Sequence, residues 1–193
     1  MKSLSLFVSL LLICSLALVA QESKEKKMDS PASVRSSYAK QAWHVEQEME
    51  SLEQAIPQDK FNWRPMEGVR SIAESFMHAA LGNYITLSKI TGKWPEGVDM
   101  KTYEKSSTEK AKILEELKKS FAAVKEGVEN TPEADYSKHV DFFGNDMNVL
   151  DMIFAAADHQ HELLGQQIAY ARMNGIVPPW TAEQMKKQEG MKK

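Results

Sequence analysis

The stretch SIAESFMHAALGNYITLSKIT, residues 71–91, decides the fold class of this 193-residue chain. It begins with Ser71, a residue type that caps helix N-termini, and Glu74 follows three positions later, as a capping box requires. Apolar residues then recur at spacings that place them on one face of a helix. This face consists of Ile72, Phe76, Ala79, Ala80, Tyr84 and Leu87. The stretch therefore predicts an amphipathic helix over about residues 72–91.

Three further stretches have the same helical period. Residues 33–56 carry apolar side chains at spacings of three, four and seven, and they end before Pro57. Residues 108–129 form the next such stretch, and residues 147–174 form the last, which stops at the sequence NGIVPP. Four helices with one apolar stripe each predict an all-α four-helix bundle. The connections are longer than antiparallel neighbours need, which indicates a long crossover. No segment shows the period of a strand.

The first twenty residues are typical of a secretory signal peptide. Lys2 precedes an apolar run from Leu4 to Val19, and the small residue Ala20 provides a cleavage site. The run is shorter than the roughly 20 apolar residues of a membrane-spanning helix, which favours a cleaved signal over an uncleaved anchor. We therefore predict an exported protein, periplasmic or extracellular, with no stable membrane span after cleavage.

These elements predict the domain organisation. Residues 1–20 are the signal peptide, 21–32 a polar linker, 33–181 the bundle and 182–193 a charged tail. Cys14 is the only cysteine, so a mature chain would have no disulfide, no thiol nucleophile and no cysteine-ligated zinc. The net charge is −3 and the basic residues are scattered, which argues against nucleic acid as a partner.

Histidines are the candidate functional residues in such a chain. His78 and His159 lie in the middle of two different predicted helices, where they could share one site. His161 is two residues beyond His159, a turn of roughly 200° on a helix, and should face away from it. The position four residues beyond His159, which would share its face, is Leu163. Glu162, three residues on, could supply a third metal ligand, or the two histidines could be polar groups in a metal-free cleft.

Two segments carry a resemblance to a known family. FNWRPMEGVRSIAESFMHAALGNY, residues 61–84, and HQHELLGQQIAYARMNGIVPPW, residues 159–180, resemble the DinB-like (DinB/YfiT) superfamily. The resemblance extends over roughly residues 34–181. It implies a four-helix bundle with a long crossover, and often a homodimer. Characterised relatives include transferases and isomerases that depend on low-molecular-weight thiols.

The resemblance also implies a divalent metal ion, zinc or nickel, held by three histidines. His78 matches the first of these ligands and His159 the second, whereas the third position is Leu163. Glu162, or His44 on the first helix, would then have to complete the metal site. The resemblance further implies that Gly165 allows close helix contact. Three aromatic residues could line or cap the cleft, although aromatics at helical spacing more often belong to the core, and these are Tyr84, Trp63 and Trp43.

Two functional hypotheses follow. In the first, the protein is an exported metal-dependent enzyme of transferase or hydrolase type, acting on an unknown small molecule through His78 and His159. In the second, Leu163 marks a degenerate metal site, and the protein is a non-catalytic bundle that binds a ligand or associates with the cell envelope. The chain contains no phosphate-binding loop, nucleophile elbow or paired-carboxylate motif that would point to another chemistry.

Overall fold

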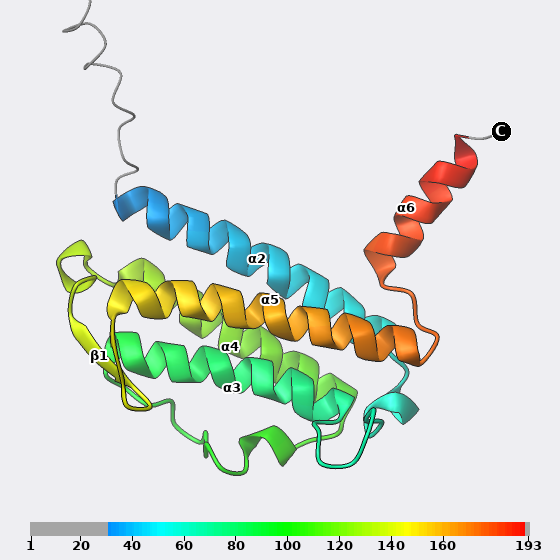
Figure 1. Ribbon diagram of the computed structural model, residues 1–193, viewed down its shortest axis with the longest axis horizontal. Coiled ribbons are helices and arrows are strands. Elements are labelled where there is room, and N and C mark those ends of the chain that lie inside the picture. The colour runs from blue at the N-terminus through cyan, green and yellow to red at the C-terminus, as the bar shows by residue number, and fades with distance from the viewer. Residues whose placement is uncertain (1–30, 192–193) are drawn as a thin grey trace, which may run out of the picture. The chain divides into compact units, whose positions relative to one another are not determined.

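The computed structural model describes residues 31–191, and the fold is helical, as the sequence predicts. Residues Arg35–Lys193 belong to one compact unit. The helices are α2 (Pro31–Ala55), α3 (Ile72–Thr91), α4 (Lys110–Asn130), α5 (Val149–Met173) and α6 (Pro179–Gly190) (Figure 1). Three short 3₁₀ helices lie in the connections, and these are η1 (Gln58–Lys60), η2 (Tyr103–Lys105) and η3 (Glu133–Asp135).

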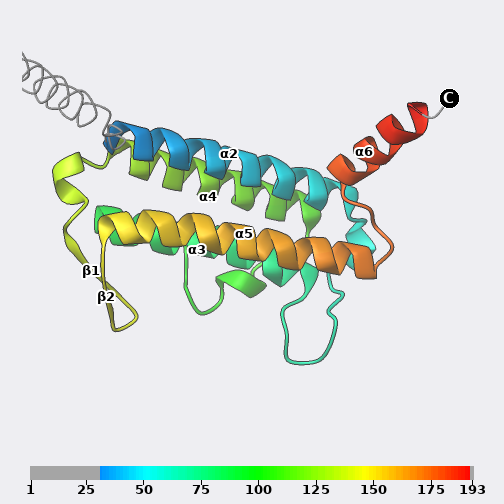
Figure 2. The same cartoon turned by 45° about the horizontal axis from the view of Figure 1, so that its top comes forward.

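The long crossover joins α3 to α4. These two helices run in the same direction, since Asn83 contacts Ser120 and the later residue Leu87 lies against Gly127. The connection between them, which includes η2, therefore returns along the length of the bundle (Figures 1 and 2). Helix α5 runs the opposite way beside α3. The predicted crossover is confirmed.

The ends of α3 follow from local sequence chemistry. The Ser71 side chain accepts a hydrogen bond from the Glu74 backbone N–H at 3.2 Å, and the Glu74 carboxylate accepts one from the Ser71 N–H at 2.8 Å. Gly92 ends the helix in the left-handed conformation at φ 71°, where a side chain would be strained. The capping box and the helix bounds at residues 72 and 91 are thus confirmed.

The core consists of the apolar faces of all four long helices. Phe61 and Phe76 stack within its larger cluster, and Phe121 contributes from α4. A second cluster joins the start of α2 to the start of α5 and to the connection before it, through Tyr38, Val140 and Met152. Burying each large apolar side chain contributes about 1.5–3 kcal/mol. None of the described residues is a cysteine, so packing of this kind holds the helices together.

One segment differs from the sequence prediction. The connection before α5 contains an antiparallel hairpin, β1 (His139–Phe142) and β2 (Asn145–Asn148), where no strand was predicted. The predicted charged tail lies largely in α6, which buries none of its residues. The predicted signal peptide and nearly all of the predicted linker lie outside the described residues. Between residues 31 and 191, no helix is long and apolar enough to span a bilayer.

Candidate functional site

His78 and His159 come together between α3 and α5. Their ring centroids are 5.1 Å apart and the rings are nearly perpendicular, at 86°. Gly82, one turn after His78, makes this approach feasible. A Cβ atom at Gly82 would lie 2.9 Å from Cδ2 and 3.1 Å from Nε2 of His159, which is closer than van der Waals contact allows. The structure thus places the two histidines at one site, as their mid-helix positions suggest.

Both imidazoles line a cavity of about 250 Å³. Apart from the two rings and one threonine hydroxyl, the side chains that surround it are apolar. The lining residues are His78, Gly82, Ile85, Thr86, Phe142, Phe143, Met152, Ala155, Ala156 and His159. One wall comes from the β1–β2 hairpin, which therefore closes a space between the helices. This combination of an apolar enclosure and a few polar groups is typical of small-molecule sites.

The three aromatic residues that were considered for the cleft lie elsewhere. Trp43 is 58% exposed on α2. Trp63 packs edge-on against Tyr170, and Tyr84 packs in the same way against Tyr103. The lining aromatics are the two phenylalanines of the hairpin, which the sequence prediction missed because it treated this segment as an irregular connection.

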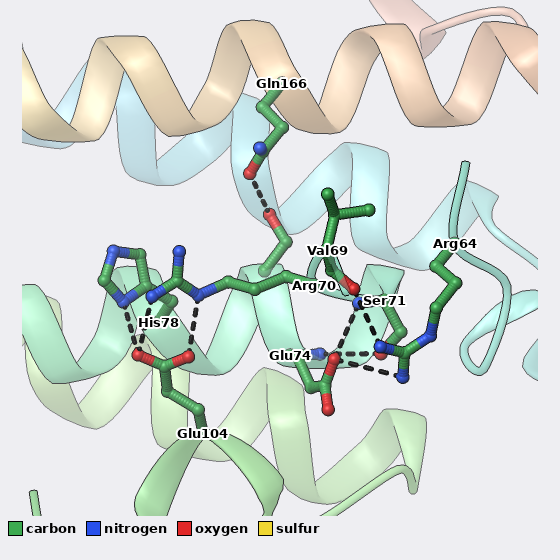
Figure 3. Close-up of polar contacts among 9 residues, drawn as sticks. Arg64, Val69, Arg70, Ser71, Glu74, His78, Glu104 and Gln166 are labelled. Atoms are coloured by element: carbon green, nitrogen blue, oxygen red, sulfur yellow. Dashed lines mark hydrogen bonds and ion pairs between the residues drawn. The ribbon is translucent and has the colours of Figure 1, made fainter. Parts of the chain in front are cut away.

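Glu104 fixes the orientation of His78 (Figure 3). Its Oε1 lies 2.7 Å from Nδ1 of His78, and Arg70 donates to Oε2 at 2.7 Å and to Oε1 at 3.1 Å. Partial burial raises the pKa of the Glu104 carboxyl. The hydrogen bonds from Arg70 and His78, the Arg70 charge and the charge of His78 in its protonated form outweigh this rise, so the pKa lies below its usual value. A carboxylate on Nδ1 leaves the neutral His78 ring with its proton there and with Nε2 as an acceptor.

His159 has a different environment. Burial lowers the pKa of His159, and the positive charges of Arg70 and, in its protonated form, of His78 lower it further, against an opposing effect of Glu162. The nearest Glu162 oxygen is 4.0 Å from Nδ1 of His159, too far for a hydrogen bond, and the Glu162 side chain is 83% exposed. His159 is therefore uncharged at neutral pH.

The other histidines of the described chain lie away from this site. His161 is exposed, and its Nδ1 lies 2.8 Å from the carbonyl oxygen of Ala157, so the prediction that it turns away from His159 is confirmed. His44 is 61% exposed and pairs with Glu48 at 3.7 Å. His139, on β1, pairs with Asp146, and this hydrogen bond raises its pKa.

A buried polar network holds the helices that carry the two imidazoles. Gln160, next to His159, donates to the Ala79 carbonyl at 3.0 Å and to the Asn83 side chain at 2.9 Å. Asn83 in turn donates to Ser120 on α4 at 3.1 Å. Each of these groups would cost free energy if it were buried without a partner, so the network fixes the rotation of α5 against α3.

Comparisons with known proteins identify the family. Residues 31–166 match the family model of the DinB superfamily. The chain belongs to the DinB superfamily. No curated protein matches the chain.

Solved structures of DinB-like proteins share the fold. A DinB-like protein from Bacillus cereus is 18% identical with a TM-score of 0.62, and one from Bacillus subtilis is 16% identical with a TM-score of 0.59. Each comparison covers 73% of this chain and 93% of the other. A conserved protein from Enterococcus faecalis is 16% identical with a TM-score of 0.60, over 70% of this chain and 93% of that one.

The metal centre that a DinB resemblance implies is not completed by the residues present. Within residues 31–191, no group of three or more histidine, cysteine, aspartate or glutamate side chains is placed to hold a metal ion. Neither Glu162 nor His44 therefore forms a three-ligand set with the imidazole pair. Leu163 is buried with 5% exposure in the core. Catalytic zinc generally has three protein ligands, so two imidazoles alone do not fit such a centre.

Gly165 also differs from expectation in this DinB bundle. It is exposed, and a Cβ atom built there would meet nothing within 4 Å. The glycine that allows close approach between α3 and α5 is Gly82. The prediction for Gly165 is therefore wrong, because that position of α5 faces away from α3.

Proposed function

We propose that the protein binds a small, largely apolar molecule in the cavity between α3, α5 and the β1–β2 hairpin. The observation that carries this proposal is the cavity itself, in which two imidazoles face an apolar lining. At about 250 Å³ it is just smaller than the roughly 300–1,000 Å³ of typical ligand pockets, which favours a compact ligand. The pair His78 and His159 would provide the polar contacts, in line with the non-catalytic alternative among the sequence hypotheses.

Filling the cavity tests the proposal. Ala155 lines the cavity, whereas Ala169 is exposed on the same helix. We expect ethylbenzene to bind the unmodified protein in isothermal titration calorimetry, because the hydrocarbon is compact enough for an apolar enclosure. Ala155→Phe should abolish this binding and Ala169→Phe should preserve it. No binding to the unmodified protein, or equal loss in both variants, would refute the proposed function.

A metal-dependent activity is the second candidate. It is supported by the Glu104 carboxylate on Nδ1 of His78, since metal-ligating histidines generally donate their second ring N–H to such a group. Zinc or nickel held by His78 and His159 would need further ligands from water or substrate, because the described chain offers no third one. Such an ion would supply Lewis-acid chemistry at the cavity.

Metal analysis tests this second candidate. Elemental analysis of protein purified without chelators would give near one equivalent of zinc or nickel, lost in His159→Ala and kept in His161→Gln. A metal content below a tenth of an equivalent in zinc- and nickel-supplemented cultures would exclude the candidate. We expect Leu163→His to raise zinc affinity, since residue 163 is on the same helical face as His159.

Export and self-association remain proposals. The pattern of residues 1–20 supports cleavage after Ala20 and a periplasmic or extracellular location. Mass spectrometry of the N-terminus of the protein recovered from the cell envelope or medium would show a chain beginning at Gln21. An intact Met1 would contradict cleavage. Sedimentation of the mature chain would test the homodimer that the resemblance implies.

A further inference from the structure

We infer that the molecule bound in the cavity has a neutral hydroxyl at one end, which donates a hydrogen bond to Nε2 of His78. This inference rests on the proposed function, because it concerns the same cavity. It adds the chemical class of the ligand: an apolar body of about the size of one aromatic ring, with a single uncharged donor.

The acceptor follows from the contacts of His78. Its Nδ1 is occupied by Glu104 at 2.7 Å, and Arg70 holds both oxygens of that carboxylate. Nε2 has no hydrogen-bond partner between residues 31 and 191, and the ring lines the cavity. In the neutral ring, a proton fixed on Nδ1 makes Nε2 an acceptor. A ligand that donates to this nitrogen gains affinity over an analogue that lacks the donor.

The ligand head should be uncharged because the cavity offers no charged partner. No lysine, arginine, aspartate or glutamate lines it. The Arg70 guanidinium is already paired with Glu104, and the Lys89 ammonium donates to the carbonyl of Asp141. A carboxylate or ammonium head would have to lose its hydration without an opposing charge, which is costly in an apolar enclosure.

The ligand body should be apolar because the hairpin wall of the cavity consists of two phenylalanine side chains. Phe142 and Phe143 lie at the turn of the hairpin with ring centroids 4.9 Å apart, and Met152 lines the cavity from α5. Lys89 joins this turn to α3 by its hydrogen bond to Asp141 and lies 6.0 Å from the Phe143 ring centroid. The aromatic wall is thus attached to the helix that carries His78.

Three matched probes separate these requirements: para-ethylphenol, its methyl ether para-ethylanisole, and para-ethylbenzoate. Calorimetry at pH 7.5 with the full chain gives the affinity of each, and the phenol-to-ether ratio reports the donated hydrogen bond. We expect the phenol-to-ether affinity ratio of the unmodified protein to be about 2- to 12-fold higher than that of His78→Phe, the range that a net hydrogen bond contributes. We expect para-ethylbenzoate to bind more weakly than the phenol.

Glu104→Ala provides a second variant in which the imidazole is intact. Without the carboxylate, the His78 proton can occupy either ring nitrogen, so the phenol-to-ether ratio should fall severalfold. His161→Gln, a substitution of the exposed histidine on α5, should leave the ratio unchanged. Circular dichroism confirms that each variant is folded.

The remaining outcomes would contradict the inference or the proposed function. An unchanged ratio in both His78→Phe and Glu104→Ala would overturn the inference, as would a benzoate affinity equal to that of the phenol. Binding of ethylbenzene without binding of the phenol would overturn it and leave the proposed function standing. Failure of ethylbenzene and all three probes to bind would refute the proposed function as well.

Discussion

A pH-dependent change in stability should arise at Glu53, a carboxyl on α2. Its side chain is completely buried, and neither oxygen has a hydrogen-bond partner among residues 31–191. Burial raises the pKa of Glu53 to about 7, although Lys110 and Lys118 oppose the rise. The folded protein therefore holds the Glu53 proton more tightly than the unfolded chain does, so this group favours folding at low pH.

The magnitude follows from the two pKa values. Each pKa unit corresponds to about 1.4 kcal/mol, so a rise from 4.5 to about 7 is worth about 3.5 kcal/mol. Because the folded-state pKa of Glu53 is the higher one, the stabilisation is complete below about pH 4.5 and is lost as the pH rises through 7. Between pH 5 and pH 8 the loss should be about 2.5 kcal/mol.

Replacing the carboxyl by an amide tests this reasoning. Glu53→Gln has no proton to lose, so its free energy of unfolding should exceed that of the unmodified protein by about 2.5 kcal/mol more at pH 8 than at pH 5. Urea denaturation followed by circular dichroism at both pH values gives this difference. Glu129→Gln, a change at an exposed position on α4, is the control and should show almost none. Equal pH dependence of Glu53→Gln and the unmodified protein would refute the reasoning.

Three further substitutions test the helix cap, the imidazole contact and the buried network. Ser71→Ala removes the α3 cap and should lower the free energy of unfolding, measured by urea denaturation, by about 1 kcal/mol. An unchanged free energy of unfolding would mean that the capping box contributes nothing. Gly82→Ala places a methyl group 2.9 Å from the His159 ring, so the ring must move, and ethylbenzene affinity in calorimetry should fall severalfold. Unchanged affinity would show that the His159 position does not matter. Gln160→Leu leaves the buried Asn83 Oδ1 unpaired and should lower the free energy of unfolding by about 1–3 kcal/mol in urea denaturation, whereas increased stability would contradict the role of the network.

The bundle could be predicted from the sequence because its signals are local. The capping pair at Ser71 and the apolar period after it fix α3 without reference to the rest of the chain. The connection between α3 and α4 is longer than two antiparallel neighbours need, and this length indicates a crossover. The phase of α5 also follows from helical spacing, which is why His159 lines the cavity and His161 does not.

The hairpin was missed because its strands are too short to show a period. Each has four residues, and Asn145–Asn148 contains one apolar side chain. The turn at Phe143 and Gly144 has positive φ angles of 52° and 84°, as two-residue hairpin turns require. Gly144 next to Asn145 was the available signal, but an aromatic residue at the first turn position is unusual for such a turn.

The partner of His78 could not be predicted because it comes from the crossover. Glu104 is 26 residues away along the chain, in η2, and no spacing rule joins an irregular connection to a helix face. The same limit applies to the glycines. Gly82 and Gly165 both lie within helical stretches, and the sequence does not show which of them faces a neighbouring helix. The packing of α5 on α3 shows that Gly82 allows the close contact.

The central claim is that a compact ligand occupies the cavity beside His78 and His159. Long-range proton–nitrogen NMR spectra of the histidine rings, recorded as para-ethylphenol is added, test it most directly. We expect saturable shifts of the His78 and His159 ring nitrogens, with the largest at His78 Nε2, and no shifts at the exposed ring of His161. Saturable binding that leaves both cavity histidines unshifted would contradict it.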